Sequence, residues 1–137
     1  MSNAQIKSKE RVEKFAEVFT AQREVEAMCN LIPDEMYEPR TTYLEPTCGE
    51  GIFLLEILRR KFKRCKSRKD YSTAINSIYG MDIQADNVKI TIENIISLCE
   101  EYFKPSKADI ETINNHIIMC DSLKIMMLLN ALQGDEK

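Results

Sequence analysis

The sequence predicts an α/β fold, in which helices flank a small parallel sheet. Two observations support this prediction. Three short β-prone runs are each followed by a segment whose apolar residues have helical spacing. Each run also ends at an acidic residue, namely Glu45, Asp82 or Asp121. Strands that alternate with helices pair in parallel through right-handed crossovers, so we expect an open sheet.

The chain begins with a helical segment, which we place at residues 5–40. Residues 6–18 and 21–32 carry apolar side chains at helical spacing, and Thr20 between them is a candidate N-cap. Prolines bracket a loop over 33–39, because proline lacks a backbone donor and disfavours helix at the preceding residue.

Residues 41–132 are expected to form the α/β domain. We expect strands at 41–45, 74–82 and 116–121, and helices at 52–62, 84–103 and 122–132. Helix 52–62 is apolar on most of its circumference and should pack on the sheet. The Met-rich stretch 119–127 is expected to fill the core of a three-layer domain.

Composition narrows the class of protein. The chain of 137 residues is 44% hydrophobic and 30% charged, and no apolar run approaches the roughly 18 residues of a membrane span. Five cysteines without a C-x-x-C pair, and a single histidine, argue against a disulfide framework or a structural metal site. No signal core is apparent near the N-terminus, so we expect a cytoplasmic protein without a membrane partner.

Positive charge is concentrated in residues 59–69, which carry eight Lys or Arg and no acid. The rest of the chain sums to about −11, and the whole chain to −3. Such a run can bind a phosphate backbone, or it can be a solvated helix end whose cations complement the helix dipole. The sequence leaves open whether 59–69 contacts DNA.

A glycine turn joins the first strand to the helix at 52–62. Gly49 and Gly51 can take positive φ and allow a ligand to approach the backbone. The dinucleotide fingerprint needs a third glycine where Leu54 stands, and the Gly-Lys-Ser/Thr of a P-loop is absent. Because Glu45 and Glu50 would repel a pyrophosphate, the turn suits a positively charged ligand, such as an amino acid or a sulfonium. The alternative is a plain strand-to-helix turn.

The later strand ends carry further candidates. Asp82 can accept hydrogen bonds from two vicinal ribose hydroxyls, or it can cap the helix that follows. Asp121 can accept from an exocyclic amine while the Ser122 amide donates to a ring nitrogen, and it too can be a cap. Cys48 is not expected to be a nucleophile because no base is assigned near it. We assign no catalytic residue.

These residues resemble a known family. The run Glu45–Phe53, EPTCGEGIF, looks like the first motif of S-adenosylmethionine-dependent DNA adenine-N6 methyltransferases of restriction–modification systems. Residues 17–28 resemble the Glu-Val-Phe-Thr-Pro element that precedes this motif, with Ala21 in place of the proline. The resemblance implies part of a Rossmann-like class I methyltransferase fold that binds S-adenosyl-L-methionine. In this fold the three predicted strands take the spatial order 3-2-1.

By this resemblance, the turn holds the methionine part of the cofactor, Phe19 and Thr20 close over it, Asp82 binds the ribose and Asp121 the adenine amine. The complete set of implied cofactor residues is Phe19, Thr20, Glu45, Pro46, Thr47, Cys48, Gly49, Gly51, Asp82, Ile83, Asp121 and Ser122.

One departure limits the expected activity. The family's Asn/Asp-Pro-Pro-Tyr/Phe motif, which holds a flipped adenine, is absent because none of the four prolines adjoins another. We therefore expect the cofactor-binding portion of a methyltransferase that acts on DNA only as part of a complete enzyme. The strand at 41–45 should have a bare edge that pairs with a homodimer partner or a complementing subunit. The alternatives are a non-catalytic adenine-nucleoside-binding module and a degenerate remnant.

Overall fold

The computed structural model describes residues 3–135, apart from the side chains of residues 3–8, 14–20 and 135. The chain divides into two units, 1–33 and 34–137, which we consider separately. Within the first unit, helix α1 (Asn3–Cys29) is continuous. The prediction that Thr20 caps a second helix is therefore wrong. Ala21 follows it, and alanine has the highest helix propensity, so nothing local ends the helix there.

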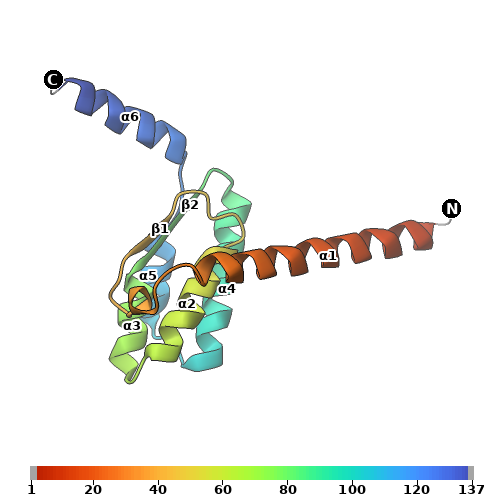
Figure 1. Ribbon diagram of the computed structural model, residues 1–137, viewed down its shortest axis with the longest axis horizontal. Coiled ribbons are helices and arrows are strands. Elements are labelled where there is room, and N and C mark those ends of the chain that lie inside the picture. The colour runs from red at the N-terminus through yellow and green to blue at the C-terminus, as the bar shows by residue number, and fades with distance from the viewer. Residues whose placement is uncertain (1–2, 136–137) are drawn as a thin grey trace. The chain divides into compact units, whose positions relative to one another are not determined.

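The second unit alternates strands and helices along the chain (Figure 1). In order, its elements are η1 (Asp34–Tyr37), β1 (Tyr43–Glu45), α2 (Ile52–Arg64), α3 (Arg68–Asn76), β2 (Ile78–Asp82), α4 (Ala85–Tyr102), α5 (Lys107–His116), β3 (Ile117–Met119) and α6 (Ser122–Asp135).

The three strands form a parallel sheet in the order β1-β2-β3, with Glu45 opposite Gly80 and Asp82 opposite Met119. The predicted α/β class with flanking helices and the predicted strand order are confirmed. The parallel arrangement brings the carboxyl ends of all three strands to one edge of the sheet.

Two helix–strand boundaries differ from the prediction. Residues 74–76, predicted as strand, are the last turn of α3, and His116 ends a helix, α5, that the sequence analysis did not predict. Both helices begin at serine caps. Ser67 accepts a hydrogen bond from the Asp70 amide, and Ser106 forms a reciprocal capping box with the third helical residue. These caps outweigh the β-propensity of the following residues.

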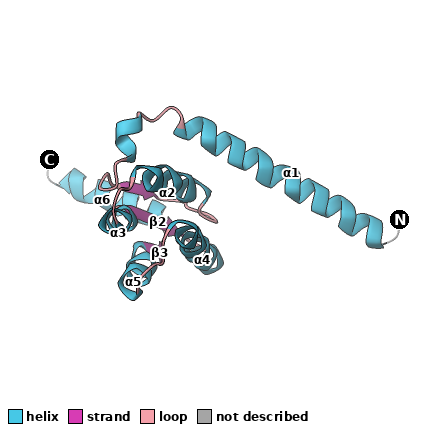
Figure 2. Ribbon diagram, turned by 90° about the horizontal axis from the view of Figure 1, so that it is seen from below, coloured by secondary structure: helices cyan, strands magenta, loops and turns pink. Residues whose placement is uncertain are grey.

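One face of the sheet carries the core. Figure 2 shows α2 and α4 on the same side of the strands. A Cβ at Gly80 in β2 would lie 2.8 Å from Leu54 Cδ1 of α2, so α2 packs closely on the backbone of β2 and a larger residue here would force Leu54 to shift. Fully buried side chains on this side include Leu54, Leu58, Phe62, Ile95, Cys99 and Ile117.

The opposite face of the sheet is largely uncovered. Leu44 and Tyr79 are register partners and are 57% and 38% exposed, and Ile118 is 42% exposed. The expected three-layer packing is therefore missing at these positions. Two crossovers of the same hand that advance in the same direction place α2 and α4 on one face, and these three residues of the other face remain exposed.

Helix α6 does not fill the core. Every residue from 123 to 134 is exposed, so the prediction that the Met-rich stretch 119–127 is core is wrong. Its composition is that of a buried helix, but the uncovered residues show that no other element of the second unit packs around it.

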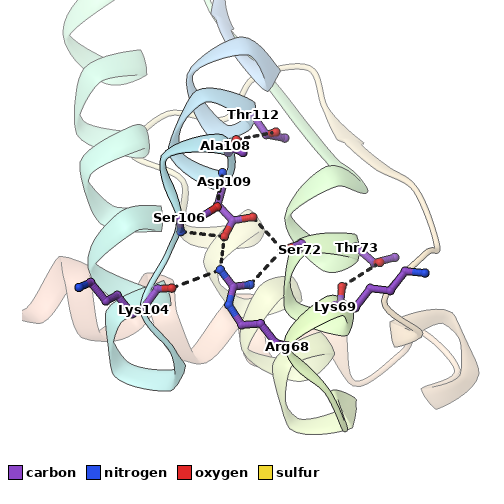
Figure 3. A network of polar contacts seen from close by, with 9 residues as sticks. All are labelled: Arg68, Lys69, Ser72, Thr73, Lys104, Ser106, Ala108, Asp109 and Thr112. Atoms are coloured by element: carbon purple, nitrogen blue, oxygen red, sulfur yellow. Dashed lines mark hydrogen bonds and ion pairs between the residues drawn. The ribbon is translucent and has the colours of Figure 1, made fainter.

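A polar network connects α3 with α5 (Figure 3). Asp109, 5% exposed, accepts hydrogen bonds from the Arg68 guanidinium (2.5 Å), the Ser72 hydroxyl (2.8 Å) and the Ser106 amide (2.9 Å). Burial alone would raise the pKa of Asp109, but these donors lower it to about 2. The network holds together the two helices that lead into β2 and β3.

The basic run 59–69 is partly used inside the fold. The Lys61 ammonium is fully buried and donates to the carbonyls of Glu38 (2.7 Å), Pro39 (3.1 Å) and Thr41 (2.5 Å). Burial lowers the pKa of Lys61 to about 8. Arg64 pairs with Glu38, and Arg68 belongs to the Asp109 network. At least three cations of the run therefore have structural partners.

Within residues 3–135, no helix has the length and apolar character needed to cross a membrane.

Candidate functional site

The glycine turn follows β1 and opens α2. Gly49 and Gly51 have φ of 55° and 90°, values that favour glycine, and Gly51 is the N-cap of α2. A Cβ at Gly49 would meet nothing within 4 Å, so open space lies beside this part of the backbone. The Glu45 carboxylate accepts a hydrogen bond from the Thr47 amide (3.2 Å) within the same turn. Pro46 and Thr47 are exposed.

Two side chains of helix α4 form hydrogen bonds with the backbone of the glycine turn. The Thr91 hydroxyl donates to the Gly49 carbonyl (2.8 Å), and the Asn94 amide donates to the Glu50 carbonyl (3.1 Å). Thr91 is fully buried, and a Cβ at Gly51 would lie 2.9 Å from its methyl group. Neither residue was predicted from the sequence. The available signal was a threonine within the apolar stripe of helix 84–103, where a polar group needs a partner.

Asp82 ends β2 and joins it to the turn. It is 5% exposed and accepts from the Gly49 amide (3.0 Å), the Gln84 amide (2.8 Å) and the Asn87 side-chain amide (3.1 Å). The Gln84 hydrogen bond is the largest influence and lowers the pKa of Asp82 despite its burial, helped by Asn87 and Gly49. The carboxylate is therefore ionised at neutral pH.

These hydrogen bonds change what Asp82 can offer a ligand. A carboxylate has about four lone-pair positions, and three are used by the chain itself. Two of the three donors contact Oδ1, so the remaining capacity lies on Oδ2. Asp82 can accept about one further hydrogen bond as it stands, rather than one from each of two ribose hydroxyls.

Asp121 follows β3 and caps α6. Its Oδ1 accepts from the Lys124 amide at 3.3 Å, while Oδ2 has no partner among the described residues. Ser122 is partly exposed, and Ile83, after β2, is 65% exposed. Asp121 therefore caps α6 through Oδ1, whereas Oδ2 accepts from no donor among the described residues and is available to a ligand.

Cys48 is a buried part of the turn. Its amide donates to the Met81 carbonyl (2.8 Å), and its Sγ lies 3.8 Å from the Thr91 hydroxyl. Burial raises the pKa of the Cys48 thiol, and the nearby carboxylates of Asp82 and Glu45 raise it further. At neutral pH the thiol is protonated, which makes it a poor nucleophile.

The structure thus brings together most, but not all, of the sequence-predicted residues. Gly49, Gly51, Cys48 and Asp82 are connected by direct contacts or through Thr91, and Glu45 lies in the same turn. Asp121 stands at the end of the neighbouring strand, since β2 pairs with β3. The side chains of Phe19 and Thr20 lie outside the described residues, and α1 belongs to the other unit.

Two further features bear on what could bind. Among the described residues, no group of three His, Cys, Asp or Glu side chains is arranged to hold a metal ion. A pocket of about 290 Å³ lies between η1 and α2, lined by Asp34, Tyr37, Arg60, Lys63 and Arg64, and includes none of the predicted cofactor residues. The strand-end site offers carboxylate oxygen acceptors and an accessible backbone turn, which suit a ligand rich in N–H and O–H donors.

Comparison of the chain with models of protein families, with curated proteins and with solved structures finds no match in any of the three.

Proposed function

We propose that this chain is the S-adenosyl-L-methionine-binding portion of a DNA adenine-N6 methyltransferase of a restriction–modification system. The observation that supports this most strongly is the contact between Gly49 and Asp82, which joins the glycine turn to the acid at the end of the next strand. In open parallel sheets, ligands bind outside the carboxyl ends of the strands. An ionised carboxylate beside an unobstructed turn suits a nucleoside that also carries positive charge.

The residues present fit the cofactor's chemistry. Open space beside Gly49 leaves room for a ligand against the backbone. Glu45 would pair with the α-ammonium of the methionine part, Asp82 would accept from one ribose hydroxyl, and Asp121 would accept from the adenine amine through Oδ2. When bound, the cofactor supplies an electrophilic methyl group on a sulfonium.

Methyl transfer to DNA would require groups that this sequence does not contain, since it has no Pro-Pro motif. We therefore propose that the target adenine is held by another polypeptide or segment. The outer edge of β1, at residues 41–45, is the place where a complementing subunit or a second copy would add a strand, because no described strand pairs there. DNA is the proposed partner of that complete assembly.

Isothermal titration calorimetry with S-adenosylmethionine tests the cofactor proposal. We expect wild-type chain to bind and Asp82→Ala to bind at least about tenfold more weakly, the equivalent of losing about 1.4 kcal/mol. Asp86→Ala is the matched control, because Asp86 is an exposed acid in the first turn of α4.

Circular dichroism would confirm that each variant is folded before its affinity is compared. Equal affinity of Asp82→Ala and wild type, or no binding by folded wild type, would contradict the proposal. Adenosine binding as tightly as S-adenosylmethionine would instead support an adenine-nucleoside module, because the sulfonium and its amino acid would then contribute nothing.

A further inference from the structure

Large apolar side chains lie on all sides of helix α6, and its polar residues between 123 and 134 (Lys124, Asn130 and Gln133) do not form a continuous polar side. Its large apolar side chains are all exposed, from Ile125 at 37% to Leu123 at 65%. They are Leu123, Ile125, Met126, Met127, Leu128, Leu129 and Leu132. Lys124 is the only charged residue between 123 and 134. A helix that is hydrophobic on all sides is normally buried, so α6 requires cover.

The sheet of the same unit carries a second uncovered apolar surface. Leu44 in β1, Tyr79 in β2 and Ile118 in β3 are exposed on the face opposite α2 and α4. Adjacent strands place these side chains side by side, because Leu44 and Tyr79 are register partners and Ile118 is the partner of Met81, two residues along β2. The ring of Tyr79 stacks on His116, at 4.1 Å between centroids, which covers it only in part.

The lack of a polar side on α6 indicates what covers it. A helix laid on a sheet buries one side and normally presents polar residues on the other. If α6 lay on a sheet, its own or another, its outer side would still be apolar. A partner with the same two surfaces covers both sides, since each α6 can then pack between a sheet face and the other α6.

We infer that α6 and the bare sheet face together form a self-association surface, whose occupant is the same surface of a second copy of this chain. Such a contact is isologous: a two-fold axis relates the two chains, and each buries the same surface against the other. The pair is therefore closed, and no further copy can add to it. The near absence of charge on α6 removes the like-charge repulsion that would oppose two identical helices meeting.

The size of the surface is sufficient for a stable pair. Full burial of an aliphatic side chain is worth about 1.5–3 kcal/mol at about 25 cal/mol/Å², which corresponds to about 60–120 Å² each. Ten exposed large side chains, seven on α6 and three on the sheet, would bury at most roughly 600–1,200 Å² per chain if all were fully covered. Stable interfaces bury about 800 Å² per partner.

This surface differs from the β1 edge and from the cofactor site. It uses side chains on a sheet face and a helix, not unpaired strand backbone. Its existence does not depend on S-adenosylmethionine binding, so the two proposals can fail independently.

Sedimentation velocity of the full chain over a range of concentrations tests the inference. We expect wild type to dimerise with a Kd below about 10 μM and Ile125→Glu/Leu129→Glu to weaken dimerisation at least about 100-fold. These two residues are four apart, on one side of α6, and Leu31→Glu is the control because Leu31 is 84% exposed and is not a residue of either surface. Ile118→Glu should also weaken the dimer.

Hydrogen exchange of the wild type keeps the test decisive if a variant misfolds. We expect α6 amides to be protected at concentrations where the dimer forms and to lose protection on dilution. A wild-type monomer at about 100 μM would overturn the inference. So would α6 amides protected in a monomer, which would place α6 on its own sheet, or a monomer that co-sediments with phosphatidylcholine vesicles.

Discussion

Two buried carboxylates in this molecule have the same exposure and the same number of donors, yet they differ in charge balance. Asp109, between α3 and α5, and Asp82, at the end of β2, are each 5% exposed and each accept three hydrogen bonds. Asp109 has Arg68 as an ion-pair partner. Asp82 has only neutral donors among the described residues, and it adjoins a turn with open space beside it.

The difference separates a stabilising carboxylate from a candidate ligand-binding one. Charge on Asp109 is neutralised within the fold, so the group has little to offer a ligand. Charge on Asp82 is stabilised by amide donors but not neutralised, and one acceptor position remains. A donor-rich ligand at the strand ends can therefore form a hydrogen bond with the charged carboxylate of Asp82, whereas the charge of Asp109 is already neutralised by Arg68.

The largest effect is expected for Asp109→Ala, which removes the ion pair with Arg68 and leaves the donors of Ser72 and Ser106 without their acceptor. We expect a loss of about 3 kcal/mol in the free energy of unfolding, measured by urea denaturation. Glu111→Ala is the control, because Glu111 is an exposed acid on the same helix, and it should cost less than about 0.5 kcal/mol. If Asp109→Ala and Glu111→Ala lost the same free energy of unfolding, the network would contribute no more to stability than an exposed acid does.

The glycine turn offers a matched pair of substitutions. Gly51→Ala should destabilise by about 2.5 kcal/mol, because φ is 90° and the new Cβ would lie 2.9 Å from the Thr91 methyl. Gly49→Ala should cost about 1 kcal/mol, because only its positive φ opposes alanine and its surroundings are open. Thermal denaturation of both variants measures the difference. A Gly49→Ala loss as large as that of Gly51→Ala would mean that the space beside the turn is closed.

The pH dependence of stability distinguishes the two carboxylates further. Because the pKa of Asp109 is lowered from 3.8 to about 2 in the folded state, its stabilisation is complete above about pH 4 and is lost as the pH falls through 2. This amounts to about 2 kcal/mol for wild type. Asp109→Asn should lack this part of the acid loss and keep the part due to Asp82, whose pKa is also lowered.

Urea denaturation at pH 5, 3 and 2 would measure that difference. Parallel acid losses in wild type and Asp109→Asn would show that Asp109 is not ionised preferentially in the folded chain.

The parts of the fold that follow from local chemistry were predictable. Helix 84–103 was placed within one residue of α4 at each end, because its apolar spacing is regular over five turns. The turn between Glu45 and Ile52 was recognisable because Gly49 and Gly51 mark positive φ. The parallel pairing of the strands followed from the alternation of strands and helices.

The errors arose where neighbouring signals compete. Residues 74–76 are apolar enough for a strand, but the cap at Ser67 starts a helix that continues through them. Helix α5 is short, and its start depends on a capping box between Ser106 and Asp109. Asp109 also accepts a hydrogen bond from Arg68 of α3, which the local sequence does not reveal. Periodicity over so few residues does not distinguish such helices from loops.

By itself, the sequence determined the alternation of strands and helices, the glycine turn and the acid at each strand end, because these depend on residue types at fixed local spacing. Only the tertiary structure decided that Asp82 is bonded to Gly49, that Thr91 and Asn94 support the turn, and that α6 and one sheet face are uncovered. These features depend on which residues that are distant in the chain come into contact, and on the hand and direction of the crossovers. Neither can be predicted from the residues of one segment alone.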